Sequence, residues 1–133
     1  MQKIMLMFPG QGSQYVGMGK DLYEKYPAAK NIIEMLGADL KKIMFEGTEE
    51  DLKNTQNAQP AIFAASMACF EILKQSADLN KFEIITAGHS LGNIPLCARP
   101  AFLIFKTAFQ WLKQEAGLFK KHRKKIPELW RRF

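Results

Sequence analysis

Two short apolar runs frame the first part of the chain. Residues 3–8 form the first run, which Pro9 and Gly10 end abruptly, and residues 82–87 form the second. Runs of this length bounded by turn residues predict buried strands. Everything between them has helical periodicity. Two strands joined through helices predict an α/β fold with a parallel sheet, because a parallel connection needs a long crossover.

The region between the strands contains four stretches with helical patterns. Pro27 ends the first stretch and Gly37 ends the second, because neither residue continues a helix well. Thr48, followed three residues later by Asp51, resembles a capping box at a further helix start. We place Pro60 in the first turn of the last helix, where its missing N–H would have no partner. We predict helices over residues 20–26, 28–36 and 57–75, and a short helix or a turn over residues 39–45.

The last of these helices carries an apolar stripe broken by small residues, which we interpret as core packing. The stripe consists of Ile62, Phe63, Ser66, Cys69, Phe70 and Leu73.

Composition is that of a globular protein, but charge is unevenly distributed. The chain has 133 residues, 47% of them hydrophobic, and a formal net charge of +6. Residues 1–92 carry nine lysines, no arginine and eleven acidic residues, whereas residues 93–133 carry ten basic residues and only two acidic ones. Cys69 and Cys97 form no disulfide framework or metal pattern, and no run is long enough to span a membrane or serve as a signal peptide. We therefore expect a cytoplasmic protein.

Candidate chemistry follows the second apolar run directly. The pattern G-x-S-x-G covers Gly88, His89, Ser90, Leu91 and Gly92. A strand that runs into such a turn is typical of a nucleophile elbow, in which flanking glycines let the chain bend sharply and expose the serine hydroxyl. Backbone N–H groups just after the serine, at a helix start, can then receive an oxyanion. An ordinary glycine turn with a capping serine is the alternative.

A second candidate segment follows the first apolar run. The loop FPGQGSQ, residues 8–14, is rich in glycine and amide side chains. Gly10 and Gly12 allow a backbone to approach a ligand closely, and Gln11 offers hydrogen-bond donors. A plain turn is again the alternative.

Three segments together resemble one family. FPGQGSQ near the start, QPAIFAASMA in the middle and AGHSLG at the elbow are similar to segments of the malonyl-CoA:acyl carrier protein transacylases of bacterial fatty acid synthesis. Acyltransferase domains of polyketide synthases share these motifs. The resemblance runs from Met1 to Gly92, and it implies an incomplete α/β hydrolase-like acyltransferase subdomain over residues 1–92.

The resemblance also implies roles for individual residues. Ser90 would attack the thioester carbonyl of malonyl-CoA, and the backbone N–H groups of Gln11 and Leu91 would form the oxyanion hole. His89 would point away from Ser90, because neighbours on such a turn diverge; the family uses a histidine far downstream as base. A family arginine roughly 25 residues after the serine pairs with the malonyl carboxylate. The acceptor is the phosphopantetheine thiol of acyl carrier protein, with no metal and no bound cofactor.

The resemblance stops at Gly92. The family continues with a pattern like EYSALCAAG, whereas residues 93–101 read NIPLCARPA. If one nucleotide was lost near this point, a permitted codon choice for these residues re-reads as EYSALCAAG. Residues 115–133 likewise re-read as RGRAIQEASKENSGAMAAV, close to family segments. This frameshift hypothesis requires TTC codons for Phe105 and Phe119, since TTT would create a TAA stop in the hidden frame.

On this hypothesis residues 93–133 are an out-of-frame basic tail, helical or poorly packed. The chain would lack the base histidine and the substrate arginine, so we expect a truncated and inactive product that is a monomer if it folds. Strands left without neighbours would make it prone to aggregation. His122 is no substitute base, because the run at residues 120–125 is typical of a solvated basic segment.

Two other functions remain open from the sequence. Apolar residues recur in the tail at roughly helical spacing between basic ones, which is typical of an amphipathic element that binds an anionic membrane or a partner. These residues are Phe102, Phe105, Phe109, Leu112 and Phe119. Alternatively, Ser90 could serve a small hydrolase with water as the acceptor, although no base or acid is evident. The acyltransferase interpretation predicts neither a nucleic-acid nor a membrane partner.

Overall fold

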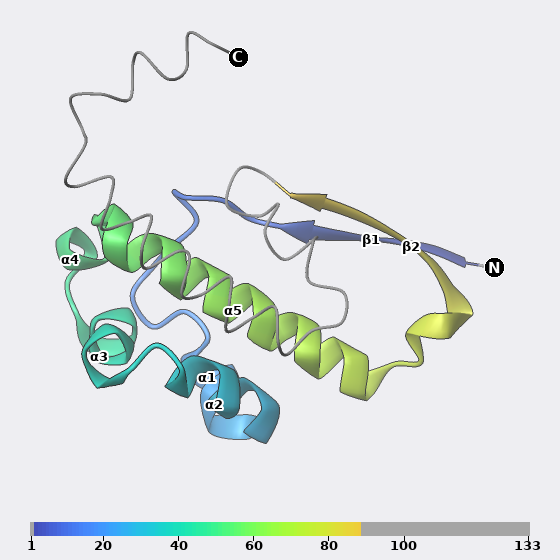
Figure 1. Cartoon of the computed structure of the whole chain (residues 1–133), viewed down its shortest axis with the longest axis horizontal. Coiled ribbons are helices and arrows are strands. Elements are labelled where there is room, and N and C mark those ends of the chain that lie inside the picture. Colours follow the sequence, from blue (N-terminus) through green and yellow to red (C-terminus); the bar gives the residue numbers. More distant parts are fainter. Residues whose placement is uncertain (1, 89–133) are drawn as a thin grey trace, which may run out of the picture.

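The computed structural model describes residues 2–88, which form a two-stranded sheet and a helical layer (Figure 1). The predicted α/β class is confirmed. The elbow residues His89, Ser90, Leu91 and Gly92, and the predicted tail, lie outside the described residues. In chain order the elements are β1 (Gln2–Phe8), α1 (Lys20–Lys25), α2 (Pro27–Glu34), α3 (Ala38–Glu46), α4 (Glu49–Lys53), α5 (Thr55–Ser76), the 3-10 turn η1 (Leu79–Lys81) and β2 (Phe82–Gly88).

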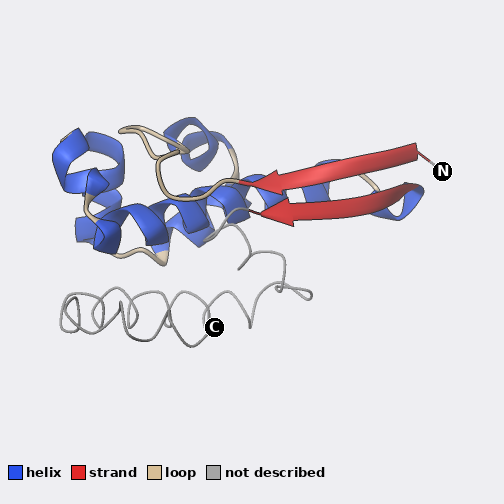
Figure 2. Cartoon of the chain, turned by 90° about the horizontal axis from the view of Figure 1, so that it is seen from above, coloured by secondary structure: helices blue, strands red, loops and turns tan. Residues whose placement is uncertain are grey.

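The two strands are parallel and fully in step. Gln2 pairs with Phe82 at one end, and Phe8 pairs with Gly88 at the other. Figure 2 shows both arrows pointing the same way, with their ends side by side. The chain between them supplies the crossover that a parallel pair needs.

Within residues 2–88, the helices pack on one face of the sheet and leave the other face uncovered. Phe8 is buried and meets Phe70 of α5 edge-on, with ring centroids 6.1 Å apart. Successive strand residues face opposite sides, so Met5 and Met7 lie on the face away from Phe8. Their exposed fractions are 57% and 77%, and Ile85 beside them on β2 is 43% exposed. The prediction of a buried first strand is therefore wrong for this face, because the helices among the described residues cover only the other one.

Helix α5 is the centre of the core. It lies between the strands and the small helices (Figure 1), and it contacts α2, α3 and α4. The residues that it buries include Phe63 and Met67 of the predicted stripe region, with Ile33, Met44 and Leu52 packed against them from the other helices. Cys69, by contrast, is exposed.

The start of α5 differs from the prediction. The helix begins at Thr55, two residues early, because the Asn54 side chain caps it by accepting from the Gln56 N–H at 3.2 Å. Pro60 consequently lies inside the helix, beyond the first turn in which we had expected it.

Two other helix boundaries follow the predicted residues. Thr48 caps α4 by accepting from the Asp51 N–H at 3.1 Å. The reciprocal arm differs from a full capping box, because the Thr48 hydroxyl donates to the Asp51 carboxylate at 2.8 Å. Gly37 follows α2 with φ of 82° and donates its N–H to the Glu34 carbonyl at 3.2 Å, as expected of a helix stop.

Candidate active site

The two candidate segments start from paired strand ends. Phe8 and Gly88 are register partners and the last residues of their strands. The loop that follows Phe8 and the segment that follows Gly88 therefore leave the sheet from neighbouring positions. In α/β proteins, ligands bind at the carboxyl ends of parallel strands. The family resemblance implied that Gln11 and Leu91 act at one site, and the register places the last strand residues before the two segments side by side.

A tight turn shapes the loop after β1. The Gly10 carbonyl accepts hydrogen bonds from the Ser13 N–H at 3.3 Å and from the Ser13 hydroxyl at 2.7 Å. Gly12 has φ of 106°, the left-handed value that a type II turn requires at its third residue. The Gly12 N–H donates to the Gln14 side chain at 2.8 Å. The plain turn that the sequence offered as the alternative is therefore present, and close approach of a ligand to Gly10 and Gly12 stays a prediction.

Gln11 sits at the corner of this turn, and its side chain is held by α5. Its Nε2 donates to Thr55 Oγ1 at 3.1 Å, and Gln59 Nε2 donates to Gln11 Oε1 at 3.4 Å. The backbone N–H of Gln11 has no acceptor among residues 2–88. An exposed donor of this kind suits a ligand oxygen. Sequence reasoning singled out Gln11 but missed both partners, although Gln59 begins the QPAIFAASMA segment.

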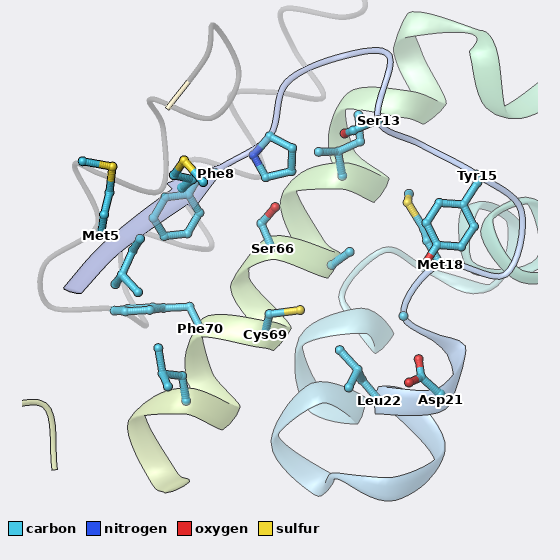
Figure 3. A pocket seen from close by; sticks show the side chains of 17 residues that line it. Met5, Phe8, Ser13, Tyr15, Met18, Asp21, Leu22, Ser66, Cys69 and Phe70 are labelled. Carbon is cyan, nitrogen blue, oxygen red and sulfur yellow. The ribbon is translucent and has the colours of Figure 1, made fainter. Parts of the chain in front are cut away.

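An apolar cleft of about 530 Å³ lies beside this loop. Figure 3 shows the cleft. It is lined by Met5 and Phe8 of β1, by Ser66, Cys69 and Phe70 of α5, and by residues at the start of α1. Pro9 and Ser13 connect it to the turn, whereas Gln11 is not part of its lining. The cleft and the Gln11 corner are therefore separate features.

Cys69 is the one thiol within the described residues. Although the residue as a whole is exposed, surrounding protein atoms partly desolvate its thiol, which raises the pKa of Cys69, and the charge of Asp21 raises it further. Since the thiolate is the nucleophilic form, Cys69 is a weak nucleophile at neutral pH.

Residues 2–88 contain no cluster of three or more His, Cys, Asp or Glu side chains able to hold a metal ion. Within the same residues, no helix has both the length and the hydropathy of a membrane span.

The chain matches the profile of one known protein family. The family profile described as "Acyl transferase domain" matches residues 5–100. The chain therefore belongs to the acyl transferase domain family, as its motifs and parallel strand pair indicated.

The similar proteins are malonyl transferases. The chain is 46% identical to the malonyl CoA-acyl carrier protein transacylase of Bacillus subtilis over 112 residues, which cover 81% of this chain and 34% of that protein. The Haemophilus influenzae protein of the same name is 37% identical over 122 residues, covering 89% and 39%. The chain thus spans little more than a third of the length of these curated relatives.

Solved structures agree with the sequence relatives. The acyl-carrier-protein-S-malonyltransferase of Bartonella henselae superposes with a TM-score of 0.76 at 37% identity, covering 90% of this chain and 40% of that one. The malonyl CoA-acyl carrier protein transacylase of Coxiella burnetii gives a TM-score of 0.78 at 28% identity, covering 90% and 38%. The fold class predicted from sequence is therefore shown by these neighbours as well.

Proposed function

We propose that this chain carries the nucleophile part of an S-malonyltransferase site. Ser90 attacks the thioester carbonyl of malonyl-CoA, the C–S bond breaks, and coenzyme A leaves as its thiol after taking up a proton. The malonyl ester on Ser90 is then attacked by the phosphopantetheine thiol of acyl carrier protein, which restores the serine hydroxyl. The observation that carries this proposal is the Phe8–Gly88 pairing, which starts the Gln11 turn and the predicted elbow at one sheet edge.

Stabilisation of the oxyanion falls to backbone donors. In the proposal, the Gln11 N–H and the Leu91 N–H point at the oxygen that becomes negative during attack. The exposed Gln11 N–H without an acceptor in residues 2–88 supports this role. Loss of one such donor typically lowers the rate by about 10²–10³-fold.

The general base and the malonyl-binding arginine are proposed to come from elsewhere. Residues 2–88 contain neither a histidine nor an arginine. We accordingly propose that the 133-residue chain alone does not complete malonyl transfer. Its location in the cytoplasm and its state as a monomer when folded belong to the same proposal.

We further propose that the reading frame changes next to Gly92. The sharp change from an arginine-free, acidic part to a basic part supports it. The prediction that the resemblance stops at Gly92 is wrong, however, because the family profile continues to residue 100 and the alignments with the two curated relatives, which cover 81% and 89% of this chain, also continue past Gly92. Sequencing the gene across the Gly92 codon and the following kilobase tests it. An additional base that restores EYSALCAAG and a downstream histidine supports the proposal. A TTT codon at Phe105 or Phe119 refutes the change of reading frame. The alternative function of residues 93–133, binding to an anionic membrane, would then be tested with anionic vesicles.

Labelling with malonyl-CoA tests the function itself. The gene is expressed with one nucleotide inserted after the Gly92 codon, through its natural downstream sequence, and the product is incubated with malonyl-CoA. Intact and peptide mass spectrometry should find one malonyl group on Ser90, and none after Ser90→Ala. Ser66→Ala, a serine in the cleft on α5, is the matched control and should leave labelling intact. Label on another residue, or no label in the restored frame, contradicts the proposal.

A further inference from the structure

The side chain of Gln11 is tied to the first turns of α5. Gln11 Nε2 donates to Thr55 Oγ1 at 3.1 Å, and Gln59 Nε2 donates to Gln11 Oε1 at 3.4 Å. Gln11 is exposed, so the surrounding core does not hold it. Of the two partners, Thr55 makes the shorter contact.

Thr55 is well suited to act as an anchor. It is the first residue of α5, directly after the capping residue Asn54. The helix fixes its backbone, and its branched β-carbon restricts the side chain to few rotamers. Its hydroxyl therefore offers a fixed acceptor to a residue 44 positions earlier in the chain.

The Gln11 N–H and the Gly10 carbonyl belong to one planar peptide unit. The Gly10 carbonyl accepts from the Ser13 N–H and the Ser13 hydroxyl, so the turn itself sets the tilt of this plane. These bonds, and the one from Gly12 to Gln14, lie within residues 10–14, whereas the Gln11 side chain ties the turn to α5. The anchor therefore holds the whole turn, and with it the Gln11 N–H, in place relative to α5. A donor must already be in place when charge develops on the substrate oxygen, since it then costs no reorganisation.

We infer that Thr55 is a positioning residue for the acyl transfer, acting through Gln11. The inference rests on the proposed function. Removing the Thr55 hydroxyl should leave the fold intact but let the Gln11 N–H drift. Displacement of a catalytic group by about 1 Å can lower a rate by about 10²-fold. We expect at least a tenfold fall in kcat with KM for malonyl-CoA unchanged, because the oxyanion contact forms only in the transition state.

The first test measures the anchor in the full 133-residue chain. Backbone ¹⁵N relaxation is compared for the wild type, Thr55→Val and Thr55→Ser, with Thr86→Val on the exposed surface of β2 as the matched control. The Gln11 backbone amide should show an order parameter of about 0.85 in the wild type, in Thr55→Ser and in the control. In Thr55→Val the order parameter should fall below about 0.6. The amides of Leu52 and Ala61 should not change, which separates loss of the anchor from loss of folding.

The second test measures acylation of Ser90 in the frame-restored protein by rapid quench. Slow acylation in Thr55→Val, with rescue in Thr55→Ser, supports the inference. A rigid Gln11 in Thr55→Val, or normal acylation despite a mobile Gln11, overturns it. Failure of the proposed function is distinguishable, because the wild type would then carry no Ser90 label while the relaxation data still report on the anchor.

Discussion

At the residue scale, single positions without side chains decide local geometry. Gly47 ends α3 and donates its N–H to the Ile43 carbonyl at 3.0 Å. A Cβ built on Gly47 would lie 2.6 Å from that carbonyl oxygen and 2.8 Å from the Ile43 Cα. Both are backbone atoms of a helix, which cannot move aside as a flexible side chain would. Only glycine fits at this helix end.

Substitution Gly47→Ala should therefore destabilise the fold. Overpacking of this kind costs about 1–3 kcal/mol, since the last turn of α3 must shift to relieve the contact. Urea unfolding of the full chain, followed by circular dichroism, measures the change. Gln75→Ala near the exposed end of α5 is the control and should stay within about 0.5 kcal/mol. A Gly47→Ala variant as stable as the wild type would show that the end of α3 relaxes freely.

At the element scale, a surface cluster joins three of the small helices, α1, α2 and α3. The Tyr23 hydroxyl on α1 donates to the Glu34 carboxylate at the end of α2, and Lys41 on α3 donates to the same carboxylate at 2.8 and 3.0 Å. The Lys41 ammonium also lies 5.3 Å from the centroid of the Tyr23 ring, which meets Phe45 edge-on. The cluster ties together helices that are too short to be stable alone.

The pH dependence of stability should reflect this cluster. The hydrogen bond from Lys41, followed by that from Tyr23, holds the pKa of Glu34 below its ordinary value of 4.5. A depressed carboxylate pKa stabilises the fold above the unfolded value, and this stabilisation is lost as pH falls through the folded value. The thermal midpoint should therefore drop more in acid for the wild type than for Glu34→Gln. Glu50→Gln on α4 is the control; equal acid sensitivity of the wild type and Glu34→Gln would contradict the role.

The core contribution of α5 gives a larger effect. Phe63 is 1% exposed and belongs to the cluster that α5 forms with α2, α3 and α4. Phe63→Ala should cost about 3–5 kcal/mol, a large share of a small domain's stability. Phe70→Ala, at a half-buried site, should cost less. Chemical denaturation of both variants compares them, and a smaller loss for Phe63 than for Phe70 would refute the assignment of the core.

The elements that sequence predicted best were those set by local chemistry. Pro27, Gly37 and Thr48 bound their helices as expected because turns and caps depend on near neighbours. The start of α5 was predicted two residues too late, because we placed Pro60 in the first turn, whereas the Asn54 side chain caps the helix at Thr55. Thr55 carried no signal for its contact with Gln11, since a hydrogen bond over 44 positions exists only after the chain folds.

At the scale of the whole molecule, segments far apart in the sequence meet at one end of the sheet. The pairing of Phe8 with Gly88 places the ends of β1 and β2 side by side, and the Gln11 side chain is hydrogen-bonded to α5. The order and spacing of the motifs identified the family, whereas this register could be known only from the folded sheet. The relatives are about three times as long as the aligned part of this chain, so the remaining catalytic groups are proposed to lie beyond it.

The last prediction concerns the face of the sheet that the helices within residues 2–88 leave uncovered. Parallel sheets are normally covered on both faces, and here Met5, Met7 and Ile85 form an exposed apolar row across both strands. Although the folded chain is proposed to be a monomer, such a row favours its aggregation as the protein concentration rises. The double variant Met7→Lys with Ile85→Lys should reduce self-association without unfolding, because neither side chain belongs to the core. Light scattering as a function of protein concentration measures self-association. Gln75→Lys near the exposed end of α5 is the control for added charge. Equal association in the double variant and wild type would show that another surface is responsible.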